Sequence, residues 1–129
     1  MDGDERAIRD VVERWHRATE AGDVDAVLDL MVEDVVFLVA GHAPMRGRGA
    51  FEQGLRTLLA THRIESSGNV REVVASGDLA YCWTELDVSI HPRAGGEAVM
   101  RSGSALTILR RQADGAWRVV RDANLLPPA

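Results

Sequence analysis

The chain has 129 residues, of which 46% are hydrophobic, and a formal net charge of -5. These values predict one globular domain over residues 1–129 and exclude a disordered chain. The acidic balance, without a basic stripe, argues against nucleic acid as a partner, and no apolar run approaches the roughly 20 residues of a membrane helix. The acidic N-terminus also lacks a signal-peptide pattern, so we expect a cytoplasmic protein without membrane contacts.

The first half of the chain has mainly helical periodicity. Residues 4–21 form an amphipathic pattern that Gly22 can end, and Asp23 can cap a second, shorter helix. Residues 35–39 are typical of a strand, and a glycine-rich loop separates them from a third helix at residues 49–61. We therefore expect three helices before the main sheet.

The second half of the chain changes to a period of two. The four predicted strands are residues 69–75, 79–91, 97–112 and 116–126. Their connections, SGD, PRAGG and ADG, are short turn sequences that require antiparallel neighbours. The predicted fold is therefore α+β, with three N-terminal helices packed on a curved antiparallel sheet. If the open face of this sheet is apolar, a homodimer is the simplest way to cover it.

Several classes of chemistry are excluded by composition. All fifteen basic residues are arginine, which excludes a lysine Schiff base, a Walker-type phosphate loop and pyridoxal phosphate held as an internal aldimine. No dinucleotide fingerprint follows a strand, so we predict no cofactor. The single cysteine, Cys82, lies in an apolar stretch and is expected to be buried and unreactive.

The histidines do not form a metal-binding pattern, because none has a second histidine at i+4. We expect His16 on the solvent side of the first helix. His42 lies in the glycine-rich loop, where it could reach the mouth of a pocket. No metal site is predicted.

The order of elements, carried by AGD, EDVVF, GRG, SGDLAYCW, RSGSALTILRR and DGAWRVVRDANLL, is similar to a known family. It resembles the SnoaL-like branch of the nuclear-transport-factor-2-like superfamily, in particular small bacterial proteins related to ketosteroid isomerase. Some of these belong to polyketide or enediyne biosynthesis clusters. The resemblance spans nearly the whole chain and implies a single cone-shaped domain, a deep apolar pocket and a homodimer packed through the convex sheet face. The superfamily includes isomerases, cyclases, hydrolases and binding domains, so the fold does not define the activity.

The resemblance also maps functional positions onto this chain. The first-helix tyrosine of ketosteroid isomerases corresponds to Trp15, their general-base aspartate falls near Val39, and their protonated aspartate falls near Ser104. All three groups differ, so we do not expect that mechanism. SnoaL-type cyclases use a late acidic residue as acid/base, which Asp122 matches by strand and parity. Arg101 and Asp122 also match part of the Asp–Arg–Asp set of limonene-epoxide-hydrolase relatives.

The last strand, WRVVRDANLL, leaves its side-chain directions open. The sequence alone favours the more apolar face, with Trp117 and Val119, as the core side. The resemblance instead turns Val120, Asp122 and Asn124 inward and makes Trp117, Val119 and Leu125 a convex set. By the same parity, the predicted inward residues of strand 79–91 are Tyr81, Trp83, Glu85 and Asp87.

Asp122 is the predicted catalytic residue. With Glu85 it could form a carboxylate pair whose apolar surroundings raise one pKa towards neutrality. The alternative is a structural ion pair of these acids with Arg101 or Arg121. Asn124 could orient a ligand carbonyl or fix the chain end.

The other predicted pocket residues have core packing, or simple space-filling, as their alternative role. The predicted binding set is Trp15, Phe37, Phe51, Leu55, Tyr81, Trp83, Glu85, Arg101, Ser104 and Asn124. Ser104 is either a hydroxyl donor at the pocket floor or a small residue that makes room.

Three functions remain open at this point. The first is a domain that binds a hydrophobic, cyclic metabolite and acts on it by cofactor-free acid/base chemistry, as an isomerase or cyclase. The second is a non-catalytic carrier of such a ligand. The third is an oligomerisation module whose pocket is filled and whose assembly exceeds a dimer.

Overall fold

The structure, a computed structural model, describes residues 2–127. Its helices are α1 (Gly3–Ala21), α2 (Val24–Leu28) and α3 (Arg48–Thr61). Its strands are β1 (Met31–Val39), β2 (Met45–Arg46), β3 (His62–Ser76), β4 (Leu79–Pro92), β5 (Val99–Arg111) and β6 (Trp117–Asn124). The predicted α+β class is confirmed.

The ends of the first two helices follow from local sequence. The Asp2 carboxylate accepts a 2.7 Å hydrogen bond from a backbone N–H in the first turn of α1, so the helix begins slightly before the predicted residue Asp4. Gly22 ends α1 in the left-handed conformation, with φ of 70°, which glycine adopts without steric cost. Asp23 caps α2 as predicted.

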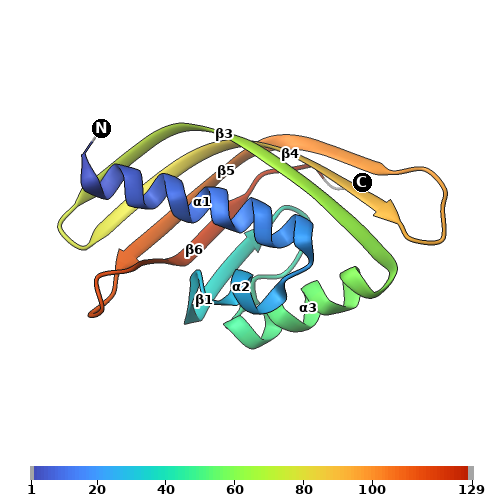
Figure 1. The fold of residues 1–129 in the computed structure, drawn as a ribbon, viewed down its shortest axis with the longest axis horizontal. Helices are drawn as coiled ribbons and strands as arrows, with labels where there is room; N and C mark the ends of the chain where they lie inside the picture. Colours follow the sequence, from blue (N-terminus) through green and yellow to red (C-terminus); the bar gives the residue numbers. More distant parts are fainter. Residues whose placement is uncertain (1, 128–129) are drawn as a thin grey trace.

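The six strands form one sheet in the order β2-β1-β6-β5-β4-β3. Neighbours from β3 to β6 are antiparallel, as the short turns predict, whereas β1 pairs with β6 in parallel. β3 begins at His62, directly after α3 and well before the predicted residue 69. The long strands β3, β4 and β5 bend over α1, and α2 and α3 lie below this arch, near β1 (Figure 1).

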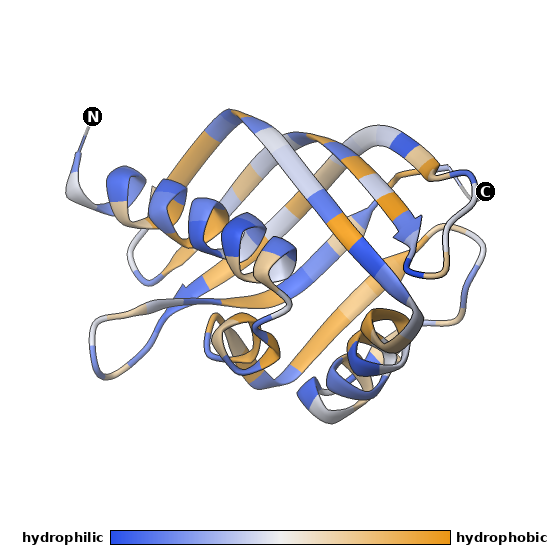
Figure 2. Cartoon of the chain, turned by 45° about the vertical axis from the view of Figure 1, so that its right-hand side comes forward, coloured by the Kyte–Doolittle hydropathy of each residue, from blue (hydrophilic) through white to orange (hydrophobic). Residues whose placement is uncertain are grey.

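The packed core lies between α1, α2 and one end of the sheet. Its largest fully buried side chains are Ile8, Val11, Val27, Met31, Val35, Cys82, Leu109 and Val119. Each such side chain stabilises the fold by about 1.5–3 kcal/mol relative to exposure. Hydrophilic residues follow the outward side of α1 (Figure 2). Among residues 2–127, no helix is both long and apolar enough to cross a membrane.

A β-bulge changes the side-chain parity of β6. The register between β5 and β6 shifts beside Val120, which is the extra residue. Trp117 and Val119 pack in the core before the bulge, so their predicted position on the convex face is wrong. Beyond the bulge, Asp122 and Asn124 also face the concave side. Odd-numbered residues of β6 therefore face inward before Val120, and even-numbered residues face inward after it.

Candidate functional site

A cavity of about 310 Å³ lies between the concave face of the sheet and helices α1 and α3. This volume is at the lower end of the range for small-molecule sites. Its lining is mostly apolar, with a few polar groups. Of the predicted site residues, seven line the cavity: Trp15, Phe37, Phe51, Leu55, Arg101, Asp122 and Asn124.

Three aromatic rings from three different elements form one wall. Trp15 of α1 meets Phe37 of β1 edge-on, with ring centroids 6.1 Å apart. Phe37 in turn stacks on Phe51 of α3 at 4.5 Å. These geometries are the favoured ones for aromatic pairs. The same rings therefore pack against the core and present an apolar surface to the cavity.

Asp122 is the buried acid of the cavity. It is 6% exposed, and the hydroxyl of Thr107 donates a 2.6 Å hydrogen bond to its Oδ1. Burial raises the pKa of Asp122 to about 6, against the opposing effect of this hydrogen bond. Among the described residues, no arginine or histidine forms an ion pair with it. The carboxyl group can therefore donate or accept a proton near neutral pH.

Asn124 lies one inward position beyond Asp122 and fixes the chain end, which is one of its two predicted roles. Its Oδ1 accepts a 2.9 Å hydrogen bond from the backbone N–H of Leu126, which fixes the chain after β6. The amide NH₂ group has no partner among residues 2–127 and faces the cavity. It is available as a donor to a ligand oxygen.

Arg101 enters the cavity from β5. Its Nε is buried and has no hydrogen-bond partner, and no acid within the described part of the chain pairs with its guanidinium. Arg101 pairs with Val88 of β4. Along β5 it lies three inward-facing positions from Thr107, the residue that donates to Asp122. The alternative of an ion pair between Arg101 and Asp122 or Glu85 is therefore wrong.

The predicted parity of β4 is wrong. Tyr81, Trp83 and Glu85 point to the convex face, since the cavity and core take the even-numbered residues of this strand. Small Ala80 and Cys82 fit against the closely packed core, where the larger aromatic rings would not.

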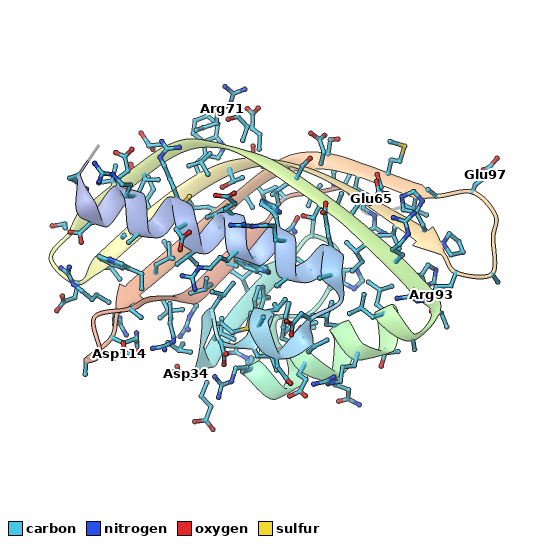
Figure 3. The ribbon with its side chains drawn as sticks, in the orientation of Figure 1. Asp34, Glu65, Arg71, Arg93, Glu97 and Asp114 are labelled. Atoms are coloured by element: carbon cyan, nitrogen blue, oxygen red, sulfur yellow. The ribbon has the colours of Figure 1, made fainter. Side chains whose placement is uncertain are left out.

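The convex face also holds Ser104, so its predicted role as a hydroxyl donor at the pocket floor is wrong. The Trp83 indole N–H donates to the Ser104 hydroxyl at 3.2 Å, and Trp83 is 40% exposed. Beside them, Arg71 donates to the Glu85 carboxylate at 2.8 Å, and Figure 3 shows Arg71 directed away from α1. Asp87 accepts a hydrogen bond from Ser102 on the same face. The predicted pair of cavity carboxylates does not form.

His16 lines the cavity, although it was expected on the solvent side of α1. Its Nδ1 lies 2.7 Å from the Ser66 hydroxyl, and burial lowers its pKa. Its spacing of four from buried Val12 is the helical signal that could have predicted this. His42 is exposed and does not line the cavity. Within residues 2–127, no three His, Cys, Asp or Glu residues are grouped as metal ligands.

The curved sheet and two helices enclose a mostly apolar cavity with one buried carboxyl group. This arrangement is typical of a class of small α+β domains. The chain belongs to the family of the SnoaL-like domain, whose model matches residues 12–120. A comparison with curated proteins finds no match.

Solved structures share the fold over nearly the whole chain. A conserved protein from Planctomyces limnophilus is 38% identical, with a TM-score of 0.93 and 98% of each chain covered. A ketosteroid isomerase-like protein from Erwinia carotovora is 19% identical, with a TM-score of 0.86 and full coverage of both chains. An NTF2-like protein with a cystatin-like fold from Novosphingobium aromaticivorans is 27% identical, with a TM-score of 0.73 and coverage of 95% and 81%.

Proposed function

We propose that the chain binds a hydrophobic, cyclic small molecule in this cavity and transfers a proton to or from it without a cofactor. The observation that carries the proposal is the buried Asp122, whose pKa is raised to about 6 within an otherwise largely apolar cavity. A carboxyl group in that range is suited to general acid/base catalysis at neutral pH. The reaction class is isomerisation, cyclisation or a related proton-transfer reaction.

In this proposal each wall of the cavity has one task. The rings of Trp15, Phe37 and Phe51 hold the apolar body of the ligand. The free amide of Asn124 donates to a ligand carbonyl, whose polarisation acidifies the neighbouring C–H. Asp122, one inward position away, accepts that proton in its ionised form and returns it to another atom of the ligand.

The family relationship supports this reading without defining the substrate. The SnoaL-like family belongs to a fold class of NTF2-like proteins, whose members are often ligand-binding proteins of isomerase or dehydratase type. The Erwinia carotovora neighbour is described as ketosteroid isomerase-like. The isomerase positions fall at Trp15, near Val39 and near Ser104, none of which is an acid, and Ser104 lies on the convex face, so the proton transfer is assigned to Asp122 instead.

A ligand screen tests the proposal. Thermal shifts are measured with polycyclic aromatic polyketides, steroids and small terpenoids on wild type, Asp122→Asn and Asp114→Asn. Asp114 is an exposed acid at the β5–β6 turn, which makes it a matched control (Figure 3). Ligands that stabilise wild type are then incubated with each protein and analysed for conversion by mass spectrometry and NMR.

We expect Asp122→Asn to lower turnover by on the order of 10²–10⁴-fold and Asp114→Asn to leave it unchanged. Full activity of Asp122→Asn would exclude this mechanism. Binding without conversion in every protein would favour a carrier. No stabilisation by any ligand, together with an assembly larger than a dimer, would favour an oligomerisation module.

We also propose that a second copy of the chain covers the convex face. An apolar row crosses four strands there, formed by Leu38, Ala123, Leu106 and Trp83 as direct cross-strand neighbours. Leu38, Leu106 and Trp83 are 40–47% exposed, which is unusual for such large side chains in a continuous row. A twofold dimer would bury this row against its own copy.

A further inference from the structure

The cavity contains a cation that nothing in the described chain neutralises. Arg101 points into it from β5, its Nε is buried, and no described residue accepts a hydrogen bond from its guanidinium. A buried polar group without a partner is costly, and native proteins satisfy nearly all of them. The buried Nε of Arg101 is therefore a donor that a water molecule or a ligand group can satisfy, and the cavity in front of it has room for a ligand.

The surroundings of Arg101 define the chemistry of that ligand group. Its cross-strand neighbours on the same face are Val88 of β4 and, beyond it, Ser66 of β3, so no acid lies beside it in the sheet. Among the described residues that line the cavity, Asp122 is the only acid, and it lies three inward positions away along the sheet. A planar guanidinium with free N–H groups matches a carboxylate, which it can bind with two parallel hydrogen bonds.

The two charged groups also give the cavity a direction. Asp122 lies next to the packed core, where Leu109 and Val119 are fully buried, while Arg101 lies further along the strands and is only partly buried. An ionised Asp122 repels an anion, and Arg101 attracts one. A ligand with an acidic group at one end would therefore bind in a single orientation, with its apolar rings towards Asp122.

We propose that the ligand of this cavity is a cyclic carboxylic acid, bound through its carboxylate to Arg101. This deepens the proposed function and rests on it, since it names the substrate class of the same cavity. The carboxylate anchors the molecule at Arg101, and the ring carbons that react lie at the opposite end, beside Asp122 and Asn124.

Matched pairs of acid and neutral amide test the carboxylate directly. Isothermal titration calorimetry at pH 7.5 measures binding of benzoate and benzamide, of 2-naphthoate and 2-naphthamide, and of 1-adamantanecarboxylate and its amide. The proteins are wild type, Arg101→Gln and Arg110→Gln. Arg110 is exposed on the same strand, and its even position in β5 directs it to the opposite face, so it is a matched control.

We expect wild type and Arg110→Gln to bind at least one acid about tenfold or more tightly than its amide, as charge-assisted hydrogen bonds require. Arg101→Gln should lose this preference, by weaker binding of the acid and unchanged binding of the amide. The comparison of acid and amide binding to wild type needs no variant, so it tests the carboxylate even if Arg101→Gln does not fold.

Equal binding of acids and amides by wild type would overturn the carboxylate proposal and leave the proposed cavity function intact. A preference for acids that persists in folded Arg101→Gln would overturn the assignment to Arg101. Failure of every acid and every amide to bind wild type would instead contradict the proposed function itself.

Discussion

The Asp122 carboxyl group depends on very few neighbours for its properties. Burial disfavours its charged form, and the single hydrogen bond from Thr107 favours that form. With no ion pair among the described residues, its pKa is set by the balance of these two effects. A change in the burial of Asp122 or in its hydrogen bond from Thr107 should therefore change the pKa of Asp122 in a predictable direction.

Replacement of Thr107 by valine should raise the pKa of Asp122 above about 6. The valine keeps the shape of Thr107 and removes the hydroxyl that stabilises the carboxylate. The measurement is an NMR titration of the Asp122 side-chain carboxyl carbon. The control is Thr84→Val, because Thr84 is equally buried and lines the same cavity but contacts Cys82 instead. An unchanged titration in Thr107→Val would contradict this account.

The raised pKa of Asp122 also predicts a pH dependence of stability. Between its ordinary pKa of 3.8 and about 6, the folded state binds more protons than the unfolded state. The stability that this residue contributes is therefore full below pH 3.8 and is lost as pH rises through 6. Asp122→Asn removes this dependence, so its stability relative to wild type should increase by roughly 2–3 kcal/mol from pH 4 to pH 7.

Urea unfolding of both proteins across this pH range checks the prediction. Asp114→Asn is a control of opposite sign, because backbone and Arg118 hydrogen bonds lower the pKa of Asp114. Because this titration lies below the ordinary pKa of 3.8, the stability of Asp114→Asn relative to wild type should decrease as pH rises towards about 4 and stay nearly constant from pH 4 to pH 7. Parallel curves for wild type and Asp122→Asn would show that Asp122 keeps an ordinary pKa in the folded protein.

Among the elements, the helices and the long strands are predictable from periodicity and turn chemistry, whereas β2 falls in the predicted glycine-rich loop. The faces of the strands are not predictable in this way. The predicted parity of β4 was wrong because it followed the family resemblance, whereas Trp83 lies on the open face of the sheet. The direction of Asp122 depends on the bulge at Val120, which no local sequence signal marks. The parallel pairing of β1 with β6 joins segments far apart in the chain, and turn sequences predict only the pairing of strands that follow one another directly.

The contact between α1 and β3 depends on a glycine. A Cβ at Gly68 would lie 2.7 Å from His16 Nε2 and 2.8 Å from a methyl group of Thr84. Gly68→Ala should therefore destabilise the protein by about 1–3 kcal/mol and displace His16 from Ser66. Gly54→Ala, in the exposed middle of α3 with only an ordinary contact at 3.6 Å, should stabilise it by about 0.5–1 kcal/mol.

Chemical denaturation measures both changes, and NMR of the His16 ring reports its displacement. If both glycine variants have the same stability, close packing of α1 on β3 does not explain the choice of glycine at residue 68. A stable Gly68→Ala with an unchanged His16 spectrum would lead to the same conclusion.

At the scale of the whole molecule, one sheet serves two purposes. Its concave face carries the core at one end and the cavity at the other, while its convex face exposes the apolar row around Leu106. The α+β class and most of the cavity's aromatic wall were predictable from the sequence. The separation of core and cavity was not, since it arises from the curvature of the sheet and the long-range pairing of β6.

A charge in the apolar row should disrupt the proposed dimer. Leu106→Glu would place a carboxylate at the centre of the covered surface, so we expect a monomer at micromolar concentration where wild type is a dimer. Light scattering after size exclusion measures the masses. Gln53→Glu, on the exposed side of α3, adds the same charge elsewhere and should leave the dimer intact. A monomeric wild type would contradict the dimer directly.

The three tryptophans lie in three different surroundings. Trp15 borders the cavity, Trp83 lies on the convex face, and Trp117 is buried in the core with the Arg111 guanidinium 5.0 Å from its ring. Variants that keep one indole each, with phenylalanine at the other two positions, would separate three optical signals. Emission from Trp15 would follow ligand entry, Trp83 would follow self-association, and Trp117 would follow unfolding. The protein thus contains its own fluorescent probe for each of the three processes.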